Sequence, residues 1–338
     1  MAPKVTALDV ARAAGVSQPT VSRVFTPGMK VSATLADKVK RAAAELGYRP
    51  NTLARSLITG QSKTIGLIVA YLDNPFYTEA LEKLSRGLRE KGYHIMVFMA
   101  ANHASDVDSV VHDLLAHQVD GIILASVAMS STLTDRLSEE GVAMVLFNRG
   151  SSDRELSSVT SANFDGGKRV AELLIAGGHA RIAHISGWQG ASTGRDRAAG
   201  FEAGLAEAGY EAFGVVDGLF SREAAMAAAR ALFAGSEGPD AIFVGNDHMA
   251  FAVMDVVRGE LGLRIPEDVS IVGYDDVAMA AWPTFELTTV RQPANRMVDA
   301  VIAQLMAQIE GDAPPKQTEI EGPLVIRRSA RIPEGWST

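Results

Sequence analysis

The chain of 338 residues contains no cysteine. This absence excludes disulfide bonds, thiolate-bound zinc, iron–sulfur clusters and a cysteine nucleophile, and it is typical of a reducing compartment. The sequence also lacks the zinc-protease motif HExxH and the phosphate-binding motif GxxxxGK[ST]. Its seven histidines are scattered, and none pairs with another at ligand spacing. We therefore expect no enzyme, no serine-hydrolase elbow, no cofactor and no metal site.

Long hydrophobic runs are absent as well. The longest near-apolar stretches, such as IGLIVAYL, have about eight residues, whereas a membrane helix needs about 20. No apolar run follows Lys4, so the N-terminus does not resemble a secretory signal. The length fits two or three domains, with 47% hydrophobic and 21% charged residues. We expect a soluble, cytoplasmic protein.

The net charge of −8 hides an uneven distribution. Residues 1–60 contain nine basic and three acidic groups, a net charge of +6. The remaining chain contains 23 basic and 37 acidic groups, a net charge of −14. A small basic segment attached to an acidic body is typical of a segment that binds a polyanion such as nucleic acid.

The basic segment is predicted to form three short helices. Thr6 is placed to cap a helix over 7–14, and Gly15 can close a tight left-handed turn. Ser17 then caps a second helix that runs to residue 25, and Ser32 caps a third that ends at Gly47. The expected core residues are Val10, Ala11, Ala14, Val16, Val21, Val24, Leu35, Val39, Ala42 and Leu46.

A helix, a glycine turn and a capped helix form the helix-turn-helix arrangement, in which the second helix enters the major groove of DNA. Arg23 is suited to a bidentate contact with guanine, and Gln18 to a contact with adenine. The predicted DNA contacts in this segment are Thr6, Ser17, Gln18, Pro19, Thr20, Ser22, Arg23 and Lys30.

From Ser62 onwards, short apolar runs alternate with amphipathic helical segments. The first series of runs is TIGLIVAYL, HIMVFMA, DGIILASV and AMVLFN, and the second is RIAHISG, GVVDGLF, DAIFVGND and SIVGYDD. Repeated strand–helix units predict parallel sheets with helices on both faces. Two series predict two doubly wound α/β lobes, with a ligand site in the cleft at the carboxyl ends of the strands.

These segments resemble the lactose/galactose-repressor (LacI/GalR) family of bacterial transcriptional regulators. VTALDVARAAGVSQPTVSRVF and VSATLADKVKRAAAELGYRPN are similar to the family's headpiece. NPFYTEALEKLSRGLREKGY, GRDRAAGF, GNDHMAFAVMDVVRGELGLRIPEDVSIVGYDD and LTTVRQP are similar to its periplasmic-binding-protein-like core.

The resemblance implies a domain organisation. A headpiece covers 1–50, a hinge 51–61 and a core 62–338, in which the chain crosses between the lobes near Ser161, Gln292 and Gly322. The N-lobe then comprises about 62–161 and 293–321, and the C-lobe about 162–292 and 322–338. Pro50 and Asn51 predict a short helix that is unstable alone. In the family this helix pairs with its dimer mate and inserts a leucine into the minor groove, here Leu57 with Asn51, Leu53 and Ala54 beside it.

Polar residues follow several predicted strands and are candidates for binding an effector. Asn246 and Asp275 end two strands of the second series, where an amide and a carboxylate suit sugar hydroxyls, whereas Asp276 is expected to be structural. The resemblance implies that Arg197 reaches into the cleft and that the Phe220 ring stacks on the ligand. The remaining candidates are Asn74, Phe76, Asn148 with its neighbour Arg149, and the hydroxyl groups of Ser192 and Thr193. Tyr77 is expected in the core.

The sequence thus predicts a homodimeric repressor that binds a pseudopalindromic operator in the nucleoid and is controlled by a carbohydrate-like molecule. Release from DNA by the effector is favoured over corepression, and no leucine heptad predicts a tetramer. Two alternatives remain: a periplasmic-type solute-binding protein, which the basic segment disfavours, and a sugar-acting enzyme, which the missing motifs disfavour.

Overall fold

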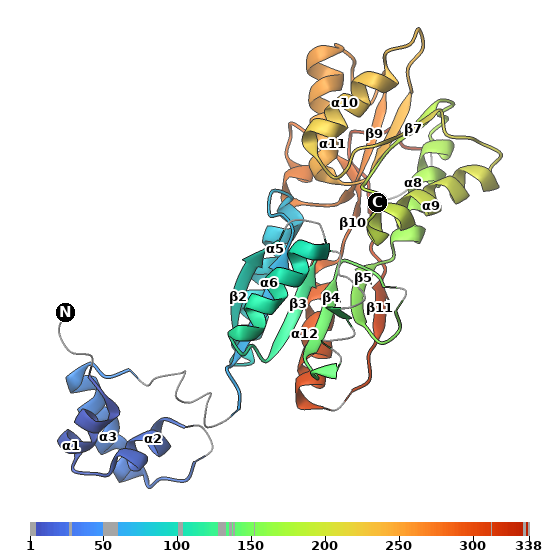
Figure 1. Ribbon diagram of the computed structural model, residues 1–338. Coiled ribbons are helices and arrows are strands. Elements are labelled where there is room, and N and C mark those ends of the chain that lie inside the picture. Colours follow the sequence, from blue (N-terminus) through green and yellow to red (C-terminus); the bar gives the residue numbers. More distant parts are fainter. Residues whose placement is uncertain are drawn as a thin grey trace. The chain divides into compact units, whose positions relative to one another are not determined.

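The computed structural model describes residues 5–26, 29–49, 60–100, 104–127, 133–134, 137, 139–151, 153–311, 313–333 and 336. The chain divides into two compact units, Met1–Lys63 and Thr64–Thr338 (Figure 1). The predicted hinge residues Asn51, Leu53, Ala54 and Leu57 lie outside the described residues.

The small unit contains the helices α1 (Ala7–Ala14), α2 (Gln18–Phe25) and α3 (Ala33–Leu46). Thr6 forms a capping box with Asp9 at the start of α1, and Gly15 closes the next turn with a positive φ. The buried residues are Val10, Ala11, Ala14, Val21, Val39, Ala42 and Ala43. The three predicted helices are confirmed, together with most of their predicted core.

The prediction for α3 was wrong in one respect. Leu46 is 38% exposed, and Ala43 takes the buried position instead. Leu46 is the last residue of α3 and extends past the buried cluster. Ser17 and Ser32 stand at the expected N-cap positions, but neither side chain forms a capping hydrogen bond. The Ser17 hydroxyl instead shares a hydrogen bond of 2.9 Å with the Thr20 hydroxyl.

The large unit contains two six-stranded sheets. The first has the order β11-β5-β4-β3-β1-β2, and all its pairs are parallel. Its strands are β1 (Thr64–Val69), β2 (His94–Met99), β3 (Gly121–Ala125), β4 (Ala143–Phe147), β5 (Ser157–Ser161) and β11 (Gln317–Ile320). This sheet, with α5 (Pro75–Glu90), α6 (Ala104–Ala116) and α12 (Ala294–Glu310), is called the N-lobe below.

The second sheet has the order β12-β10-β9-β8-β6-β7 and is parallel except for the β10–β12 pair. Its strands are β6 (Ile182–Ser186), β7 (Gly214–Asp217), β8 (Ala241–Val244), β9 (Ser270–Asp275), β10 (Thr288–Arg291) and β12 (Leu324–Val325). The C-lobe adds α8 (Asn163–Ala176), α9 (Ser192–Glu207), α10 (Arg222–Leu232), α11 (Asp247–Asp255) with a π-helical turn (Val256–Glu260), and a 3-10 turn (Ala278–Ala281). All eight predicted strand runs are strands.

The chain passes between the two sheets three times, after β5, β10 and β11. The three crossing segments are hydrogen-bonded to one another: Ala162 N–H donates to Ile320 O over 3.1 Å, and Arg291 N–H to Pro323 O over 2.9 Å. A Cβ atom at Gly322 would overlap the carbonyl oxygen of Arg291, so this close approach requires glycine. The crossings therefore form a compact connection on one side of the cleft.

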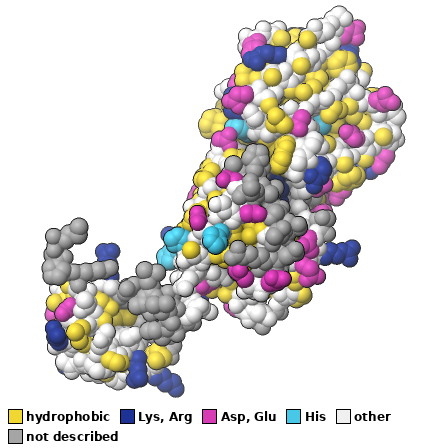
Figure 2. Space-filling model, in the orientation of Figure 1, with side chains coloured by type: hydrophobic (Ala, Val, Ile, Leu, Met, Phe, Trp, Pro, Cys, Tyr) yellow, Lys and Arg dark blue, Asp and Glu magenta, His cyan; other side chains and the backbone are white. Residues whose placement is uncertain are grey.

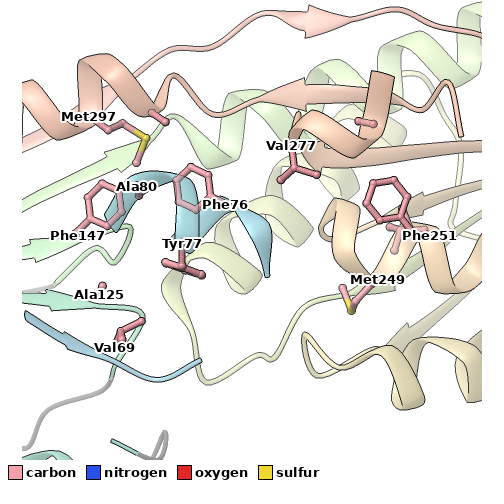
Figure 3. Packing of buried hydrophobic residues seen from close by; sticks show 14 of the residues in the cluster. Val69, Phe76, Tyr77, Ala80, Ala125, Phe147, Met249, Phe251, Val277 and Met297 are labelled. Atoms are coloured by element: carbon pink, nitrogen blue, oxygen red, sulfur yellow. The ribbon is translucent and has the colours of Figure 1, made fainter. Parts of the chain in front are cut away.

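The largest hydrophobic cluster contains residues of both lobes. Figure 3 shows Phe76, Ala80 and Phe147 together on the N-lobe side, with Val277, Met249 and Phe251 on the C-lobe side. Phe76 and Phe147 stack with their ring centroids 5.9 Å apart. This packing fixes the N-terminus of α5 against β4 and so positions the residues beside Phe76 at the cleft.

Candidate functional site

The outer face of α2 is polar and accessible. Gln18, Pro19, Ser22 and Arg23 are exposed, whereas Val21 on the opposite face is fully buried. Arg23 donates to no residue of the described part of the chain, so its guanidinium is available to a partner. Figure 2 shows Lys and Arg side chains on the visible face of the small unit. The predicted DNA-reading residues therefore share one accessible surface.

The other predicted DNA contacts of the headpiece are placed differently. Thr6 is exposed, but its hydroxyl donates to the Asp9 carboxylate over 2.7 Å. Hydrogen bonds from Thr6 hold the pKa of Asp9 below its usual value. Ser17 is exposed, Thr20 is half-buried behind it, and Lys30 is exposed in the segment before α3.

A small cavity lies between the lobes at the carboxyl ends of their parallel strands. Seven of the nine predicted effector residues line it: Asn74, Asn148, Thr193, Arg197, Phe220, Asn246 and Asp275. Tyr71 and Tyr77 complete the lining: the sequence did not single out Tyr71, whereas Tyr77 is buried in the core as expected and also reaches the cavity. The fold thus brings together residues that are up to 204 positions apart.

Asp275 lies at the centre of this constellation and is buried. Its carboxylate accepts from Gln292 Nε2 over 2.6 Å and from Asn74 Nδ2 over 3.1 Å. Arg197 Nη1 lies 3.6 Å from the same carboxylate. Burial raises the pKa of Asp275, whereas Arg197, Asn74 and Gln292 each lower it. Because Asn74 belongs to the N-lobe, Asp275 also forms a direct bond between the lobes.

Arg197 is held rigidly in the C-lobe wall. Its Nε donates to Asn163 Oδ1 over 2.8 Å, and its Nη1 donates to Gly245 O over 2.7 Å. The guanidinium carbon stands 3.7 Å from the centroid of the Tyr274 ring, which is a cation–π arrangement. The arginine therefore enters the cleft as predicted, and two of its five N–H donors are already used by Asn163 and Gly245.

Asn246 and Phe220 form the rest of the C-lobe lining. The Asn246 side-chain oxygen accepts from Met249 N–H over 2.8 Å and caps α11. Its amide nitrogen has no partner among the described residues and lies at the cavity. Phe220 is half-buried, and its ring packs on Gly187, where any side chain would collide with it.

Asn148 and the two tyrosines belong to the N-lobe wall, and Arg149 lies behind it. Asn148 Nδ2 donates to the Tyr77 hydroxyl over 2.9 Å, while its Oδ1 is buried without a partner in the described residues. Arg149 Nη2 donates to Ser126 Oγ over 2.7 Å, and Ser126 Oγ donates to the Tyr71 hydroxyl over 3.0 Å. Burial raises the pKa of Tyr77. Tyr77 is therefore a neutral hydrogen-bonding group.

Three residues of the lining have a backbone conformation that side chains rarely adopt. Asn148 and Phe220 have φ values of 55° and 56°, and Asp275 has a φ of 128°. Such conformations cost about 1–3 kcal/mol each and are concentrated at functional sites. Their coincidence at one cavity supports its assignment as the binding site.

Two predicted residues do not line the cavity. Phe76 is buried in the core, stacked on Phe147, while its neighbour Tyr77 lines the cavity instead (Figure 3). The Ser192 hydroxyl accepts from Gly150 N–H over 2.8 Å and joins the lobes. Residues 190–194 do match the GxSxG pattern, contrary to expectation, but Ser192 has no histidine or carboxylate partner among the described residues.

Asp247 lies behind the cavity and is completely buried. Its carboxyl group accepts from Thr289 Oγ1 over 2.6 Å and from Val277 N–H over 3.0 Å. Burial, together with the nearby Asp275 carboxylate, raises the pKa of Asp247 to about 8. Asp247 is therefore mostly neutral at pH 7. Asp276, by contrast, forms ion pairs with Arg291 and Arg327 on the far side, a structural role as expected.

This raised pKa predicts a pH dependence of folding stability. The native state keeps the Asp247 proton up to about pH 8, whereas the unfolded chain releases it near pH 4. Above about pH 4 the native state therefore binds more protons, and stability falls as pH rises towards 8. We expect Asp247→Asn, which mimics the neutral acid, to flatten urea-unfolding stability between pH 5 and 8. The control Asp299→Asn changes an exposed residue and should keep the wild-type dependence of stability on pH. If the stability of Asp247→Asn falls with pH as steeply as that of the control, the raised pKa does not belong to Asp247.

The described residues contain neither a candidate metal site nor a candidate membrane span. No cluster of three or more His, Asp or Glu side chains in those residues could hold a metal ion. No helix within them is long and apolar enough to cross a membrane.

Comparisons with known proteins agree with both halves of this architecture. Residues 6–51 match the family model of bacterial regulatory proteins of the lacI family. Residues 62–328 match the model of periplasmic binding proteins and the sugar-binding domain of the LacI family.

Individual relatives cover nearly the whole chain. The chain is 34% identical to the HTH-type transcriptional regulator CelR of Thermobifida fusca, over 95% of this chain and 96% of the relative. The structure of this chain is similar to that of a lac repressor dimer bound to operator and the anti-inducer ONPF, with a TM-score of 0.88 and 28% identity. The similarity covers 97% of this chain and 99% of the lac repressor chain. A complex of CelR with cellobiose gives a TM-score of 0.72 and 32% identity, covering 97% and 100%.

The helix-turn-helix headpiece, the two-lobed core and these full-length similarities lead to one assignment. The chain belongs to the LacI family of bacterial regulatory proteins.

Proposed function

We propose that this protein is a transcriptional repressor that binds a pseudopalindromic operator as a homodimer and is controlled by a small carbohydrate-like molecule in the cleft. The observation that carries the proposal is the combination in one chain of an exposed, unpaired Arg23 on α2 with the polar cavity between the lobes. CelR, a relative of this chain, forms a complex with cellobiose, and the similar lac repressor binds an operator as a dimer.

The proposed DNA contacts are the accessible residues of the headpiece, 1–50, and the hinge over 51–61. On the headpiece, the second helix enters the major groove and presents Gln18 and Arg23 to base edges. In the hinge, Leu57 enters the minor groove, with Asn51, Leu53 and Ala54 beside it. Because its partner is chromosomal DNA, we place the protein in the cytoplasm, on the nucleoid.

The proposed coupling between effector and operator runs through the contacts between the lobes. Besides Asn74–Asp275, Arg149 Nη1 donates to Thr193 Oγ1 over 2.8 Å across the cleft. A ligand in the cavity competes with these bonds and so changes the relative stability of lobe arrangements. It alters operator affinity only by its different affinity for the two arrangements. We propose that the effector releases the repressor from DNA.

An electrophoretic mobility shift assay separates this function from a solute-binding protein or an enzyme. The protein is expected to bind pseudopalindromic DNA specifically and to release it during a titration with carbohydrates. A chain that binds a sugar but shows no preference for any operator sequence would refute the proposal. The operator sequence is obtained beforehand by in vitro selection from a random library.

The dimer is proposed to form along the flanks of the lobes. Strand β2 is the edge of the N-lobe sheet, and two of its apolar side chains, Val97 and Met99, are 42% and 52% exposed. An unpaired edge strand with exposed apolar residues is a natural surface for association.

This interface gives a testable prediction. Val97→Glu places a charge in the proposed contact and is expected to weaken dimerisation by at least tenfold in sedimentation equilibrium, with operator affinity falling in parallel. Ile332→Glu changes another exposed apolar residue away from β2 and should leave the dimer intact. If both variants dimerise like the wild type, β2 is not part of the interface.

A further inference from the structure

The two buried arginines at the cavity differ in their partners. Arg149 and Arg197 are the buried arginines among the described residues, with 6% and 2% of their surface exposed. Arg197 lies 3.6 Å from the Asp275 carboxylate, which serves as its counter-ion. Asp247, the other buried carboxyl group beside Asp275, accepts hydrogen bonds from Thr289 and Val277 and forms no ion pair with either arginine. One of the two arginines is therefore left without a carboxylate partner among the described residues.

That arginine is Arg149. Its Nη1 donates to Thr193 Oγ1 over 2.8 Å and to Asn148 O over 3.2 Å. Its Nη2 donates to Ser126 Oγ over 2.7 Å and to Ser126 O over 3.4 Å. Every one of these acceptors is neutral, and no carboxylate of the described residues forms an ion pair with Arg149. Burying a charge without a counter-ion is costly, so such a group marks a place where a ligand supplies the opposite charge.

The location of Arg149 favours an anion from the cavity side. The guanidinium lies one hydrogen bond behind the cavity surface, since its partner Thr193 is part of the lining. Thr193 also belongs to the first turn of α9, which contains no acidic residue and whose N-cap, Ala191, offers no capping side chain. The positive end of this 16-residue helix therefore adds to the potential that Arg149 creates.

Other groups of the cavity lining suit neutral hydroxyls. Asn148 Oδ1 is a buried acceptor without a partner in the described residues, and the amide nitrogen of Asn246 is a donor without one. The ring of Phe220 offers an apolar face beside them.

We propose that the effector is an anionic monosaccharide derivative, whose carboxylate or phosphate group takes Arg149 as its counter-ion while its hydroxyls bind Asn148, Asn246 and Asp275. This inference rests on the proposed function of the cavity as the effector site. It narrows the ligand from carbohydrates in general to sugar acids and sugar phosphates.

Matched ligand pairs test the proposal by isothermal titration calorimetry on the full-length protein. The probes are D-glucose, D-glucuronate and D-glucose 6-phosphate, with D-galactose, D-galacturonate and D-galactose 6-phosphate as a second set. At least one anionic sugar is expected to bind at least tenfold more tightly than its neutral counterpart. A carboxylate and a phosphate are distinguished by which derivative binds. Equal or weaker binding of all the anionic members would overturn the proposal.

Three variants connect the preference to Arg149. Arg149→Gln keeps hydrogen-bond donors but removes the charge, and it should reduce the anionic preference to less than threefold. Arg149→Lys keeps the charge and should retain the preference. Arg195→Gln removes an exposed charge on the same helix as Thr193 and should behave like the wild type. An anionic preference that survives in Arg149→Gln would show that another group supplies the positive charge.

A second measurement does not depend on the identity of the sugar. Inorganic phosphate, compared with sodium chloride at equal ionic strength, is expected to raise the Tm of the wild type and Arg195→Gln but not of Arg149→Gln. Equal shifts in all three proteins would contradict an anion site at Arg149. Operator binding is measured in parallel, because a wild type that binds no operator contradicts the proposed function and not only the ligand class.

Discussion

Arg23→Ala is expected to abolish specific operator binding. The side chain lies on the exposed face of α2 and has no partner within the described residues, so it is free to form a bidentate contact with guanine. Each such contact contributes about 1–3 kcal/mol of discrimination, and a dimer on a pseudopalindrome makes it twice. The expected loss of specific affinity is therefore about 30-fold to more than 10⁴-fold.

The measurement is the ratio of affinities for operator and scrambled DNA at one fixed salt concentration. Arg41→Ala is the matched control, because it removes the same charge from α3 rather than α2. Arg41 is not among the proposed base contacts, so Arg41→Ala should keep the wild-type ratio of the two affinities. If Arg23→Ala lowers both affinities equally, Arg23 contacts the backbone and another side chain reads the bases.

The headpiece was predictable because its signals are local. The Thr6 capping box marks the start of α1, turn glycines mark the ends of α1 and α3, and the spacing of Val10, Ala14 and Val21 places them on buried faces. Leu46 was the exception, since its burial depends on where the neighbouring helices stop. Helix length relative to neighbours is a tertiary property that the sequence pattern does not contain.

Strand β5 shows a different limit. Its sequence, SSVTS, has no apolar run, and no strand was predicted there although all five residues are buried. The Ser157 hydroxyl accepts from Gln308 Nε2 over 2.8 Å and from Lys316 N–H over 3.0 Å. These partners lie about 150 residues away in sequence, so burial of the hydroxyl becomes favourable only once α12 and β11 are in place.

The site was predictable where strand ends determine it. Asn246 and Asp275 follow parallel strands, and any fold of this class brings their side chains to the cleft. Tyr77 lines the cavity and Phe76 does not, and this depends on how α5 is rotated about its axis. The packing of Phe76 on Phe147 sets that rotation. The role that we propose for Arg149 could not be predicted from the sequence either. It follows from the absence of a carboxylate partner for that side chain among the described residues, and only the folded structure shows this.

Loss of the Asp275 carboxylate is expected to have the second largest effect. Asp275 receives hydrogen bonds from both lobes and lies beside Arg197 as its counter-ion, and we propose that it also accepts hydrogen bonds from the ligand. A lost charge-assisted hydrogen bond costs about 1.5–3 kcal/mol. Asp275→Ala should therefore lower effector affinity about ten- to a hundredfold. Arg197→Ala should do the same, with an additional loss of stability because Arg197 also holds Asn163 and Gly245.

The decisive experiment measures operator affinity of each variant across an effector titration. Asp275→Asn keeps the shape of the side chain but removes its charge, and it should give an intermediate effector response. Asp299→Asn, an exposed change on α12, serves as the control and should respond like the wild type. The Asp275 variants are expected to bind operator without effector, because the headpiece residues are unchanged, and to need more effector for release. A wild-type response in Asp275→Ala and Arg197→Ala would show that the effector binds elsewhere. Complete loss of operator binding would show that these residues maintain the fold or the dimer rather than contact the ligand.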